Sequence, residues 1–484
     1  MIYPDLELEI PTDLGRVHFV GIGGAGMSAI ASMMHTAGVT VTGSDRGANY
    51  STSALEAAGV RVAIGHAAEN VGSADTLVVT GALSPENPEY LRARELGIPV
   101  LHRSQALAWL ARSGRLVAVA GAHGKTTSTG MLATGLRGLG TDPSFVNGSV
   151  IAGIGAASAA GTDELFVIEA DESDKSFLIY DTQVALITNV DPEHLDFFGS
   201  RENFMAAFVE FARGASELLV ISADDPGAQE VLATLRAERA ERAERAPGAD
   251  RGGSVTPVRT FGYAAEADVR IVSVDTSGRA TLELESAGER ASAQLGVFGE
   301  YNAVNAAGAV AVLTGLGFTL QASLTAVAAF TGTHRRFEFH GEPGGVRLYD
   351  DYAHHPTEVQ ALLASARSVA GEGKLIVVHQ PHLYSRTRTF YREFAAAFAA
   401  ADHTIVLEID GVREAPDPST TGALVTEAFA DPSRASYVDD WARAAEQVRE
   451  LASPGDLVLV VGAGTVYKIV PQLAEALGEA NGAV

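Results

Sequence analysis

The chain has 484 residues, of which 46% are hydrophobic and 20% are charged, a composition typical of a globular protein with two or three domains. A net charge of −25 argues against a general nucleic-acid binder, and the lack of cysteine excludes disulfides, thiolate nucleophiles and cysteine metal sites. Because the first residues lack a signal-peptide pattern and no uncharged apolar run reaches about 18 residues, we expect a cytoplasmic protein without a membrane span.

A glycine-rich turn follows the first predicted strand. The sequence RVHFVGIGGAGM places Gly21, Gly23 and Gly26 between an apolar strand and a helix, and the next strand ends in Asp45. This GxGxxG pattern, with an acidic residue about 20 positions further on, predicts a diphosphate bound at a helix N-terminus. The pattern alone fits an NAD enzyme, a domain that binds a UDP-sugar, or a purely structural turn.

Two further strands end in polar residues. Ser84 follows the strand in TLVVTGALS, and His102 ends the strand in IPVLH. In a doubly wound sheet the carboxyl ends of the strands form the ligand crevice, so both side chains are candidates for it. The alternative for each is a solvated loop residue. We expect this first Rossmann-like domain to cover residues 1–113.

The segment LVAVAGAHGKTT, residues 116–127, predicts a buried strand, a glycine loop and a helix start. In such a loop the backbone N–H groups and the positive end of the helix bind phosphate. The pattern is shortened to GxxGKT, because Val119 stands where the general phosphate loop has its first glycine. We expect Lys125 to contact the terminal phosphates and the Thr126 hydroxyl to bind magnesium. The alternative is a glycine turn with an exposed lysine.

Two later strands of the same predicted domain end in acidic and amide residues. An apolar strand that ends in acids after a phosphate loop is how nucleotide enzymes hold magnesium. Neighbouring parallel strands could bring Glu169 and His194 to one crevice, whereas the alternative is a solvated acidic loop. The polar residues at these two strand ends are Glu169, Asp171, Glu172, Asp174, Asn189, Asp191, Glu193, His194 and Asp196.

Three features complete the central domain, which we expect over residues 114–332. The charged repeat within residues 235–253 has no apolar stripe, so it predicts an exposed helical extension or a flexible insertion without chemistry. Alternating residues from Thr260 to Gly299 predict antiparallel strands at the domain edge. A helix then carries Asn302 and Asn305 on one face, as caps or as nucleotide contacts.

A third doubly wound α/β domain is predicted over residues 333–484, because apolar strands alternate there with alanine-rich helical stretches. The fold class is therefore α/β with a Rossmann-like N-terminal domain, a central phosphate-loop domain and a Rossmann-like C-terminal domain. The pair His354-His355 does not predict a zinc site, since no cysteine or HExxH arrangement accompanies it. The other polar residues at strand ends are Asp350, Asp351, His379, His382, Ser385, Arg386 and Arg388.

Several motifs, taken together and in this order, resemble those of the Mur ligases: GIGGAGM, GAHGKTT, EADESD, TNVDPEHLD, an NxxN helix start, HRRFE, DDYAHHPTEV and QPHLYSRT. These ATP-dependent enzymes form amide bonds in peptidoglycan precursor synthesis, and the similarity is strongest to the alanine-adding branch. The resemblance implies that ATP and Mg²⁺ or Mn²⁺ serve to join L-alanine to the lactyl carboxylate of UDP-N-acetylmuramate through an acyl phosphate. It implies a monomer or homodimer with no nucleic-acid partner and no membrane insertion.

The resemblance also implies roles for individual residues. The catalytic residues would be Lys125, His194 and Arg336, and the metal ligands would be Thr126, Glu169 and His194. The ATP site would comprise Gly121, Ala122, His123, Gly124, Lys125, Thr126, Thr127, Asn302, Asn305, Arg336, Asp351 and His354. The UDP-sugar site would comprise Gly21, Gly23, Gly24, Ala25, Gly26, Asp45, Ser84 and His102. The amino-acid pocket would comprise Tyr352, His382, Arg386 and Arg388.

Two positions depart from the family pattern. Tyr301 stands where the family usually has histidine, and Leu383 stands where several relatives have arginine, so neither position inherits the family role. Three other functions stay open at this point: a related ligase that adds a preformed peptide to the same sugar nucleotide, an NAD-dependent dehydrogenase, and a non-catalytic nucleotide-binding module. A dehydrogenase would leave the phosphate loop and the acidic strand ends unexplained.

Overall fold

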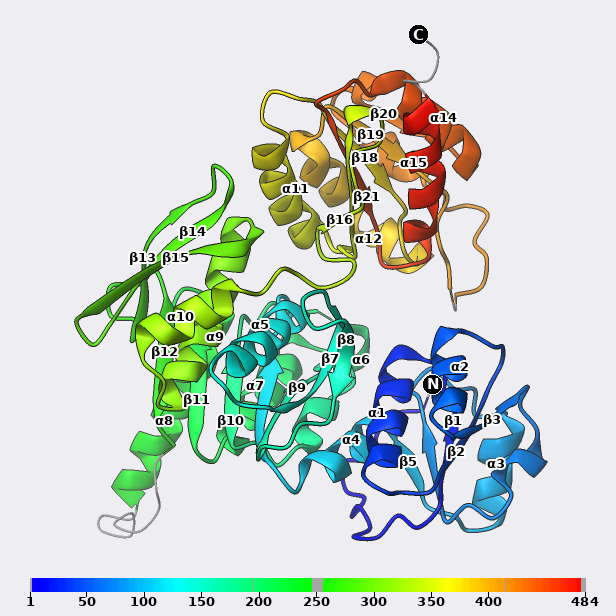
Figure 1. The fold of residues 1–484 in the computed structure, drawn as a ribbon, viewed down its shortest axis with the longest axis vertical. Coiled ribbons are helices and arrows are strands. Elements are labelled where there is room, and N and C mark those ends of the chain that lie inside the picture. The colour runs from blue at the N-terminus through cyan, green and yellow to red at the C-terminus, as the bar shows by residue number, and fades with distance from the viewer. Residues whose placement is uncertain (1, 194, 246–255, 413, 480–484) are drawn as a thin grey trace. The chain divides into compact units, whose positions relative to one another are not determined.

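The computed structural model describes residues 2–193, 195–245, 256–412 and 414–479. Three β-sheets with helices packed against them organise the chain (Figure 1). The chain forms two compact units. The first comprises Met1–Ser273, Glu283–Ala293 and Val304–Phe330, and the second comprises Val274–Leu282, Gln294–Ala303 and Thr331–Val484.

The N-terminal sheet has five parallel strands in the order β3-β2-β1-β4-β5, which confirms the predicted Rossmann-like arrangement. Both faces are buried, because Val78 packs into one apolar cluster while Leu77 and Val79 pack into another. The strands are β1 (Val17–Val20), β2 (Val41–Asp45), β3 (Arg61–Ile64), β4 (Thr76–Val79) and β5 (Val100–His102). The helices are α1 (Ala25–Thr36), α2 (Tyr50–Ala57), η1 (Ala68–Val71), α3 (Pro88–Glu95) and α4 (Arg103–Ala111).

The central sheet has the order β15-β14-β13-β12-β11-β10-β6-β9-β7-β8 and is parallel from β13 to β7. Its strands are β6 (Arg115–Ala120), β7 (Ser144–Ile151), β8 (Ala156–Ala159), β9 (Leu165–Glu169), β10 (Val184–Ile187), β11 (Leu218–Ser222), β12 (Val258–Gly262), β13 (Val269–Asp275), β14 (Arg279–Ser286) and β15 (Glu289–Phe298). Its helices are α5 (Lys125–Gly138), η2 (Ser176–Ile179), α6 (Leu195–Phe198), α7 (Arg201–Gly214), α8 (Pro226–Arg245), α9 (Glu300–Gly315) and α10 (Leu320–Ala328).

The pairing of β12 with β13 is parallel, so the prediction of antiparallel strands from Thr260 onwards is wrong at its first pair. Alternation of apolar and polar residues specifies which face a side chain occupies, but it carries no information about strand direction. The charged repeat continues α8 as far as Arg245, and the rest of that predicted insertion, residues 246–253, lies outside the described residues.

The C-terminal sheet has the order β16-β17-β21-β18-β19-β20 and is parallel except for β16, which confirms the predicted third α/β domain. The strands are β16 (Glu338–Phe339), β17 (Arg347–Asp351), β18 (Leu375–His379), β19 (His403–Val406), β20 (Ala435–Tyr437) and β21 (Leu457–Val461). The helices are η4 (Pro343–Gly345), α11 (Pro356–Ala370), α12 (Tyr384–Ala397), η5 (Phe398–Ala400), α13 (Ala423–Thr426), η6 (Pro432–Arg434), α14 (Trp441–Leu451), η7 (Val466–Ile469) and α15 (Val470–Glu479).

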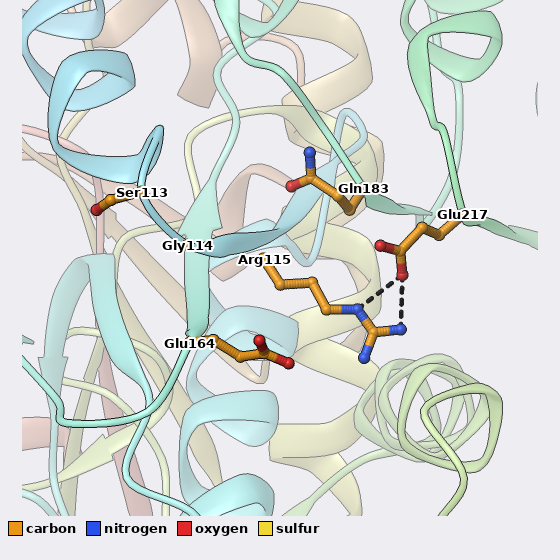
Figure 2. Close-up of a pocket in the computed structure, with 6 residues that line it drawn as sticks. All are labelled: Ser113, Gly114, Arg115, Glu164, Gln183 and Glu217. Atoms are coloured by element: carbon orange, nitrogen blue, oxygen red, sulfur yellow. Dashed lines mark hydrogen bonds and ion pairs between the residues drawn. The ribbon is translucent and has the colours of Figure 1, made fainter.

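A polar pocket of about 530 Å³ opens at the amino edge of the central sheet (Figure 2). It is lined by Ser113, Gly114, Arg115, Glu164, Gln183 and Glu217, and Arg115 Nε donates to Glu217 Oε2 at 2.7 Å. In open parallel α/β sheets ligands bind beyond the carboxyl ends of the strands, so this pocket lies at the edge opposite to the expected site.

In the described part of the chain, no helix combines the length and the hydropathy that a bilayer-spanning helix requires.

Candidate active site

The phosphate loop joins the carboxyl end of β6 to the start of α5, and two of its positions require glycine. Gly121 and Gly124 have φ angles of 138° and 84°, in the region that disfavours other residues. A Cβ atom on Gly121 would lie 2.1 Å from Thr188 Oγ1, and one on Gly124 would lie 2.4 Å from Asn305 Oδ1. The predicted ATP-site residue Asn305 is therefore packed directly against the loop.

The end of β10 holds this loop from the side. Asn189 Oδ1 accepts from the backbone N–H of His123 at 2.8 Å, and Asn189 Nδ2 donates back to the His123 carbonyl at 2.9 Å. Thr188 Oγ1 donates to the same carbonyl at 2.7 Å. The sequence placed Asn189 at a strand end but gave no sign of this bracing role, because 66 residues separate the two partners.

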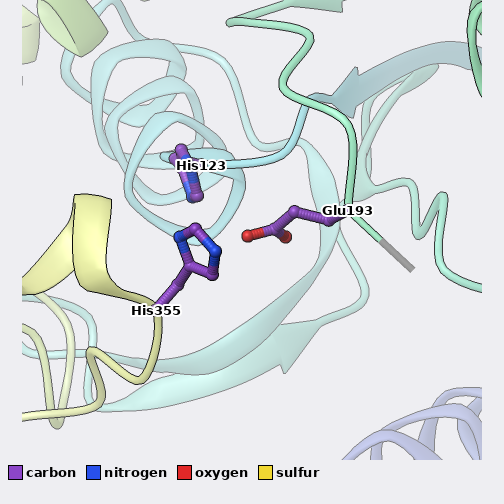
Figure 3. Close-up of side chains that lie close together, drawn as sticks. All are labelled: His123, Glu193 and His355. Carbon is purple, nitrogen blue, oxygen red and sulfur yellow. The ribbon is translucent and has the colours of Figure 1, made fainter. Parts of the chain in front are cut away.

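Acidic residues after β10 lie near the His123 ring. Figure 3 shows His123 on the loop and Glu193 on the segment that follows β10, and their polar side-chain atoms lie within 4.8 Å of each other. Asp191 Oδ2 lies 3.7 Å from His123 Nε2. The predicted metal ligand and catalytic residue His194 lies outside the described residues.

The Lys125 ammonium is bound within the loop and to one carboxylate. Its Nζ donates to the Gly121 carbonyl at 2.6 Å, to the Ala122 carbonyl at 3.2 Å and to Glu172 Oε1 at 2.9 Å. Burial opposes the charged form, but the carboxylates of Glu172, Glu169 and Asp171 raise the lysine pKa above its usual range. Lys125 therefore stays protonated at neutral pH.

Thr126 and Glu169 form a candidate magnesium site. Thr126 Oγ1 lies 3.1 Å from Glu169 Oε1, and Glu169 Oε2 accepts from the Gly148 N–H at 2.9 Å. Neighbouring ligands of an octahedral Mg²⁺, each at about 2.1 Å from the ion, lie about 3 Å apart, so this oxygen pair has the separation that the ion requires. A Cβ on Gly148 would lie 2.4 Å from Glu169 Oε2, so glycine leaves room for the carboxylate.

The first glycine turn is fixed to the end of β2. The N–H groups of Gly21 and Ile22 both donate to the Ser44 carbonyl, at 2.8 and 2.9 Å. The N–H of Gly23 donates to Asp45 Oδ2 at 2.8 Å. The acidic residue predicted for a bound nucleotide therefore also holds the turn itself.

The turn leads into α1, whose start has no side-chain cap. Gly24 is the N-cap residue and Ala25 and Gly26 begin the helix, so the first N–H groups have no side-chain acceptor there. A Cβ on Gly24 would meet no atom closer than 3.4 Å, whereas one on Gly23 would lie 2.5 Å from Asn49 Nδ2. This is the geometry of an anion-binding helix N-terminus in the first unit.

The two remaining predicted UDP-sugar residues are His102, which is buried, and Ser84, which is exposed. His102 caps α4, because its Nδ1 accepts from the Ser104 N–H at 3.4 Å, and Ser104 Oγ lies 2.7 Å from the same nitrogen. Burial, together with the neighbouring Arg103 guanidinium, lowers the pKa of His102 to about 4. Ser84 is exposed on the loop after β4 and accepts from the Glu86 N–H.

Arg103, which we predicted only as a residue at a crevice-forming strand end and gave no specific role, lies close to the start of α1. Its Nη1 lies 3.8 Å from the position that a Cβ on Gly26 would occupy, and its Nη2 donates to Asp171 Oδ2 at 2.9 Å. The guanidinium is therefore bonded to the acidic segment after β9 and lies near the uncapped helix start. Its place directly after a strand end, beside His102, was the only signal in the sequence.

In the second unit, Asp351 ends β17 in a buried position. Its two oxygens accept from the N–H groups of Ala353 and Phe337, each at 2.7 Å. Burial raises the pKa of Asp351 to about 6, although the Arg336 guanidinium acts in the opposite direction. Arg336 also lies 5.4 Å from the centre of the Tyr352 ring. The structure thus brings these three predicted site residues together.

Most of the predicted amino-acid pocket also gathers in this unit. The His354 ring lies 5.4 Å from Tyr352 and 6.4 Å from His382, measured between ring centres. Burial, with the Arg386 and Arg336 cations, lowers the pKa of His354 to about 4 despite the Glu358 carboxylate. Arg388 instead forms an ion pair with Asp417.

The two positions that depart from the family pattern, and the first asparagine of α9, have defined environments in the second unit. Burial raises the pKa of Tyr301 above its usual range. Leu383 has a φ of 73° at the start of α12, a strained conformation for a leucine. Asn302 Nδ2 donates to the Phe298 carbonyl at 2.8 Å, as a helix-start contact.

Comparisons with known proteins agree with this architecture. Models of the Mur ligase family, catalytic domain, of the Mur ligase middle domain and of the Mur ligase, glutamate ligase domain match residues 16–115, 119–313 and 335–464. A UDP-N-acetylmuramate–L-alanine ligase of Clavibacter sepedonicus is 55% identical over 99% of this chain and 96% of that protein. The chain belongs to the Mur ligase family.

Other Mur ligases are similar along nearly the whole chain. The UDP-N-acetylmuramate–L-alanine ligase of Paenarthrobacter aurescens is 45% identical over 96% of this chain and 98% of its own length. A UDP-N-acetylmuramate–alanine ligase crystal structure from Thermotoga maritima aligns with a TM-score of 0.77, at 27% identity and over 95% of this chain and 98% of that one. A murein peptide ligase structure from Psychrobacter arcticus aligns with a TM-score of 0.68, at 25% identity and over 96% and 99%.

Proposed function

We propose that this Mur ligase joins L-alanine to the lactyl carboxylate of UDP-N-acetylmuramate at the expense of ATP. The main support is the arrangement of Lys125, Thr126 and Glu169 at the carboxyl ends of β6 and β9, which fits a nucleotide triphosphate with its magnesium ion. Two relatives named for this reaction, at 55% and 45% identity over almost the full chain, support the choice of substrates.

The reaction needs an activated carboxylate. A lactyl carboxylate oxygen attacks the γ-phosphorus of ATP, which gives an acyl phosphate and ADP. The amine of L-alanine then attacks the acyl carbon, loses a proton, and expels inorganic phosphate as the amide forms. Lys125 neutralises charge on the phosphoryl group in flight, when its three oxygens carry most of the negative charge.

The proposed metal ligands are Thr126, Glu169 and His194, and the proposed ion is Mg²⁺ or Mn²⁺. When bound, the ion would act as a Lewis acid that stabilises negative charge on the transferring phosphoryl group. The described residues fit this role, because the Thr126 and Glu169 oxygens already have the spacing of neighbouring ligands. Asn305 and the loop from Gly121 to Thr127 would hold the phosphates on the same edge of the sheet.

The other two substrates are assigned by the chemistry of the remaining sites. The UDP diphosphate would bind at the uncapped start of α1, where Ala25 and Gly26 offer backbone N–H groups, since the Gly24 N–H already donates to the Gly21 carbonyl. The L-alanine carboxylate would bind Arg386, which acts electrostatically on His354 in the second unit. The domain limits 1–113, 114–332 and 333–484 and the cytoplasmic location stay predictions.

Phosphate release tests the proposal. The protein is incubated with ATP, Mg²⁺ and UDP-N-acetylmuramate, and L-alanine is compared with a preformed tripeptide beginning with L-alanine. We expect phosphate release that depends on the sugar nucleotide and on L-alanine, and little with the tripeptide. Release with the tripeptide alone would assign the chain to the peptide-adding ligases, and binding of ATP without turnover would leave only a nucleotide-binding module.

A further inference from the structure

Glu89 is a fully buried carboxylate in the N-terminal domain that none of the sites above uses. It lies in the first turn of α3, and its side chain is 0% exposed. Taking a carboxylate out of water is costly unless hydrogen bonds replace its hydration. The contacts that replace that hydration therefore indicate what the residue is for.

Donors from separate elements surround the two Glu89 oxygens. Oε2 accepts from Ser44 Oγ at 2.6 Å and from His18 Nε2 at 3.0 Å. Oε1 accepts from Asn70 Nδ2 at 2.9 Å and from the Ala67 N–H at 3.1 Å, with His66 Nδ1 at 3.3 Å. Burial acts to raise the pKa of Glu89, but these donors lower it to about 2, so the carboxylate is ionised at neutral pH.

The directions of these hydrogen bonds follow from the donor groups. A carboxylate only accepts, so the Ser44 hydroxyl must give its single proton to Glu89. The His66 Nδ1 lies 3.1 Å from Ser44 Oγ and 3.3 Å from Glu89 Oε1, so its single N–H is shared between these two acceptors. The Ser44 side chain is thus fixed from two directions, at the carboxyl end of β2.

Ser44 is also the residue that holds the glycine turn. Its carbonyl accepts from Gly21 and Ile22, and the turn then leads into the uncapped start of α1. Asn70 provides a second connection, because its Nδ2 donates both to Glu89 Oε1 and to the Gly65 carbonyl, the latter at 3.0 Å. Gly65 N–H in turn donates to the backbone carbonyl of Asp45 at 2.8 Å. Glu89 therefore connects to both residues that bind the turn.

Stability alone is a weak explanation for such a group. Buried ionic clusters are often no more stabilising than apolar residues of similar volume, because desolvation offsets their attraction. What a carboxylate with several donors adds is a fixed geometry, since each donor must keep its direction. Here the group held in a fixed geometry is Ser44, which binds the glycine turn that we assign to the diphosphate.

We propose that Glu89 is a positioning residue of the sugar-nucleotide site, which orients the glycine turn through Ser44. The inference rests on the proposed function only in that the turn binds the diphosphate of UDP-N-acetylmuramate. Glu89 does not touch the ligand. Its loss should therefore weaken binding of the sugar nucleotide while the ATP site, built on the central sheet, keeps its properties.

The test uses the full chain with Glu89→Gln, which keeps the size of the side chain but replaces one acceptor by a donor. Calorimetry should show about tenfold weaker binding of UDP-N-acetylmuramate, because a factor of about ten in affinity is what one hydrogen bond typically contributes. The KM for this substrate should rise similarly, while kcat and the KM for ATP change less than about twofold. Ser44→Ala should reproduce the effect, and the double variant should be no worse than either single variant.

Asp75→Asn is the matched control, because it removes one carboxylate from the same domain at the start of β4, where Asp75 pairs with Arg16. It should leave both affinities unchanged. If Glu89→Gln does not fold, Ser44→Ala decides the matter alone. A lower melting temperature with unchanged sugar-nucleotide affinity in every folded variant would overturn the inference. Loss of binding in these variants without alanine-dependent turnover in the wild type would contradict the proposed function instead.

Discussion

The ammonium of Lys125 lies 2.9 Å from Oε1 of Glu172, a carboxylate that is only 1% exposed. Burial raises the pKa of Glu172 to about 7, although the lysine charge acts in the opposite direction. Lys125 is therefore oriented by Glu172 and by two carbonyls of its own loop. A bound γ-phosphate would compete with Glu172 for the same ammonium.

Replacement of Lys125 by alanine should remove most of the turnover. The loss should appear in kcat, at about 10² to 10³-fold, because the ammonium acts on charge that develops during phosphoryl transfer. Binding of UDP-N-acetylmuramate, measured by calorimetry, should stay nearly normal. Lys374→Ala, which removes an ammonium that donates to the Leu451 carbonyl in the C-terminal domain, is the control. Loss of sugar-nucleotide binding with normal ATP binding would reverse the assignment of nucleotides to domains.

Glu169 and Glu164 flank the two ends of β9 and provide a test of the metal site. Glu169→Gln should raise the Mg²⁺ concentration needed for half-maximal activity, since a neutral amide is a weaker ligand than a carboxylate. Glu164→Gln lies in the pocket at the amino edge of the same sheet and should behave like the wild type. Titration of activity with Mg²⁺ measures both. Equal magnesium dependence in the two variants would exclude Glu169 as a ligand.

The sequence was sufficient for features that are encoded locally. Apolar runs and glycines placed the strand, loop and helix around Lys125 and the turn at Gly21. It was insufficient for contacts between distant residues, since Asn189 meets His123 across 66 positions and Glu89 meets His18 across 71.

Buried polar groups were the least predictable of all. The sequence does not distinguish a buried glutamate such as Glu89 from a solvated one, and only the fold shows which groups donate to it. His102, which we predicted for the crevice by its position after β5, also caps α4, and the sequence did not reveal that contact. The direction of β13 was likewise hidden, because alternation of residues encodes a face and not a direction.

Arg386 and Arg388 should differ in their effect on L-alanine. Arg388 is already paired with Asp417, so its charge is neutralised within the protein. Arg386→Ala should raise the KM for L-alanine by about tenfold or more, as expected when a charged hydrogen bond to a carboxylate is lost. Arg388→Ala should change it less than about twofold. Steady-state kinetics at saturating ATP distinguish them, and the opposite order would move the carboxylate site to Arg388.

His379 should make stability depend on pH. It is buried against Phe394 and Phe398, and burial lowers its pKa from 6.5 to about 4 although the Val461 carbonyl opposes this. Between these two values the unfolded chain binds a proton that the folded chain does not. The stability that His379 contributes is therefore full above pH 6.5 and is lost as the pH falls towards 4, by roughly 3 kcal/mol.

His379→Asn removes this titration while an amide replaces the hydrogen bond to Val461. Urea unfolding of both proteins from pH 4 to pH 7 measures the difference. As the pH is lowered, the free energy of unfolding should fall less steeply for the variant. The difference in slope corresponds to at most one proton bound by the unfolded chain. Parallel curves for the two proteins would show that His379 has the same pKa in the folded and the unfolded chain, which would contradict the prediction.

An isotope-transfer experiment tests the central claim most directly. UDP-N-acetylmuramate labelled with ¹⁸O in the lactyl carboxylate is incubated with the protein, ATP, Mg²⁺ and L-alanine. Mass spectrometry then measures the masses of the amide product and of the inorganic phosphate. An acyl phosphate route predicts the alanyl amide and one ¹⁸O atom in each inorganic phosphate released, because the carboxylate oxygen that attacks ATP leaves with the phosphorus. Amide formed with unlabelled phosphate, or phosphate released without amide, would contradict the account.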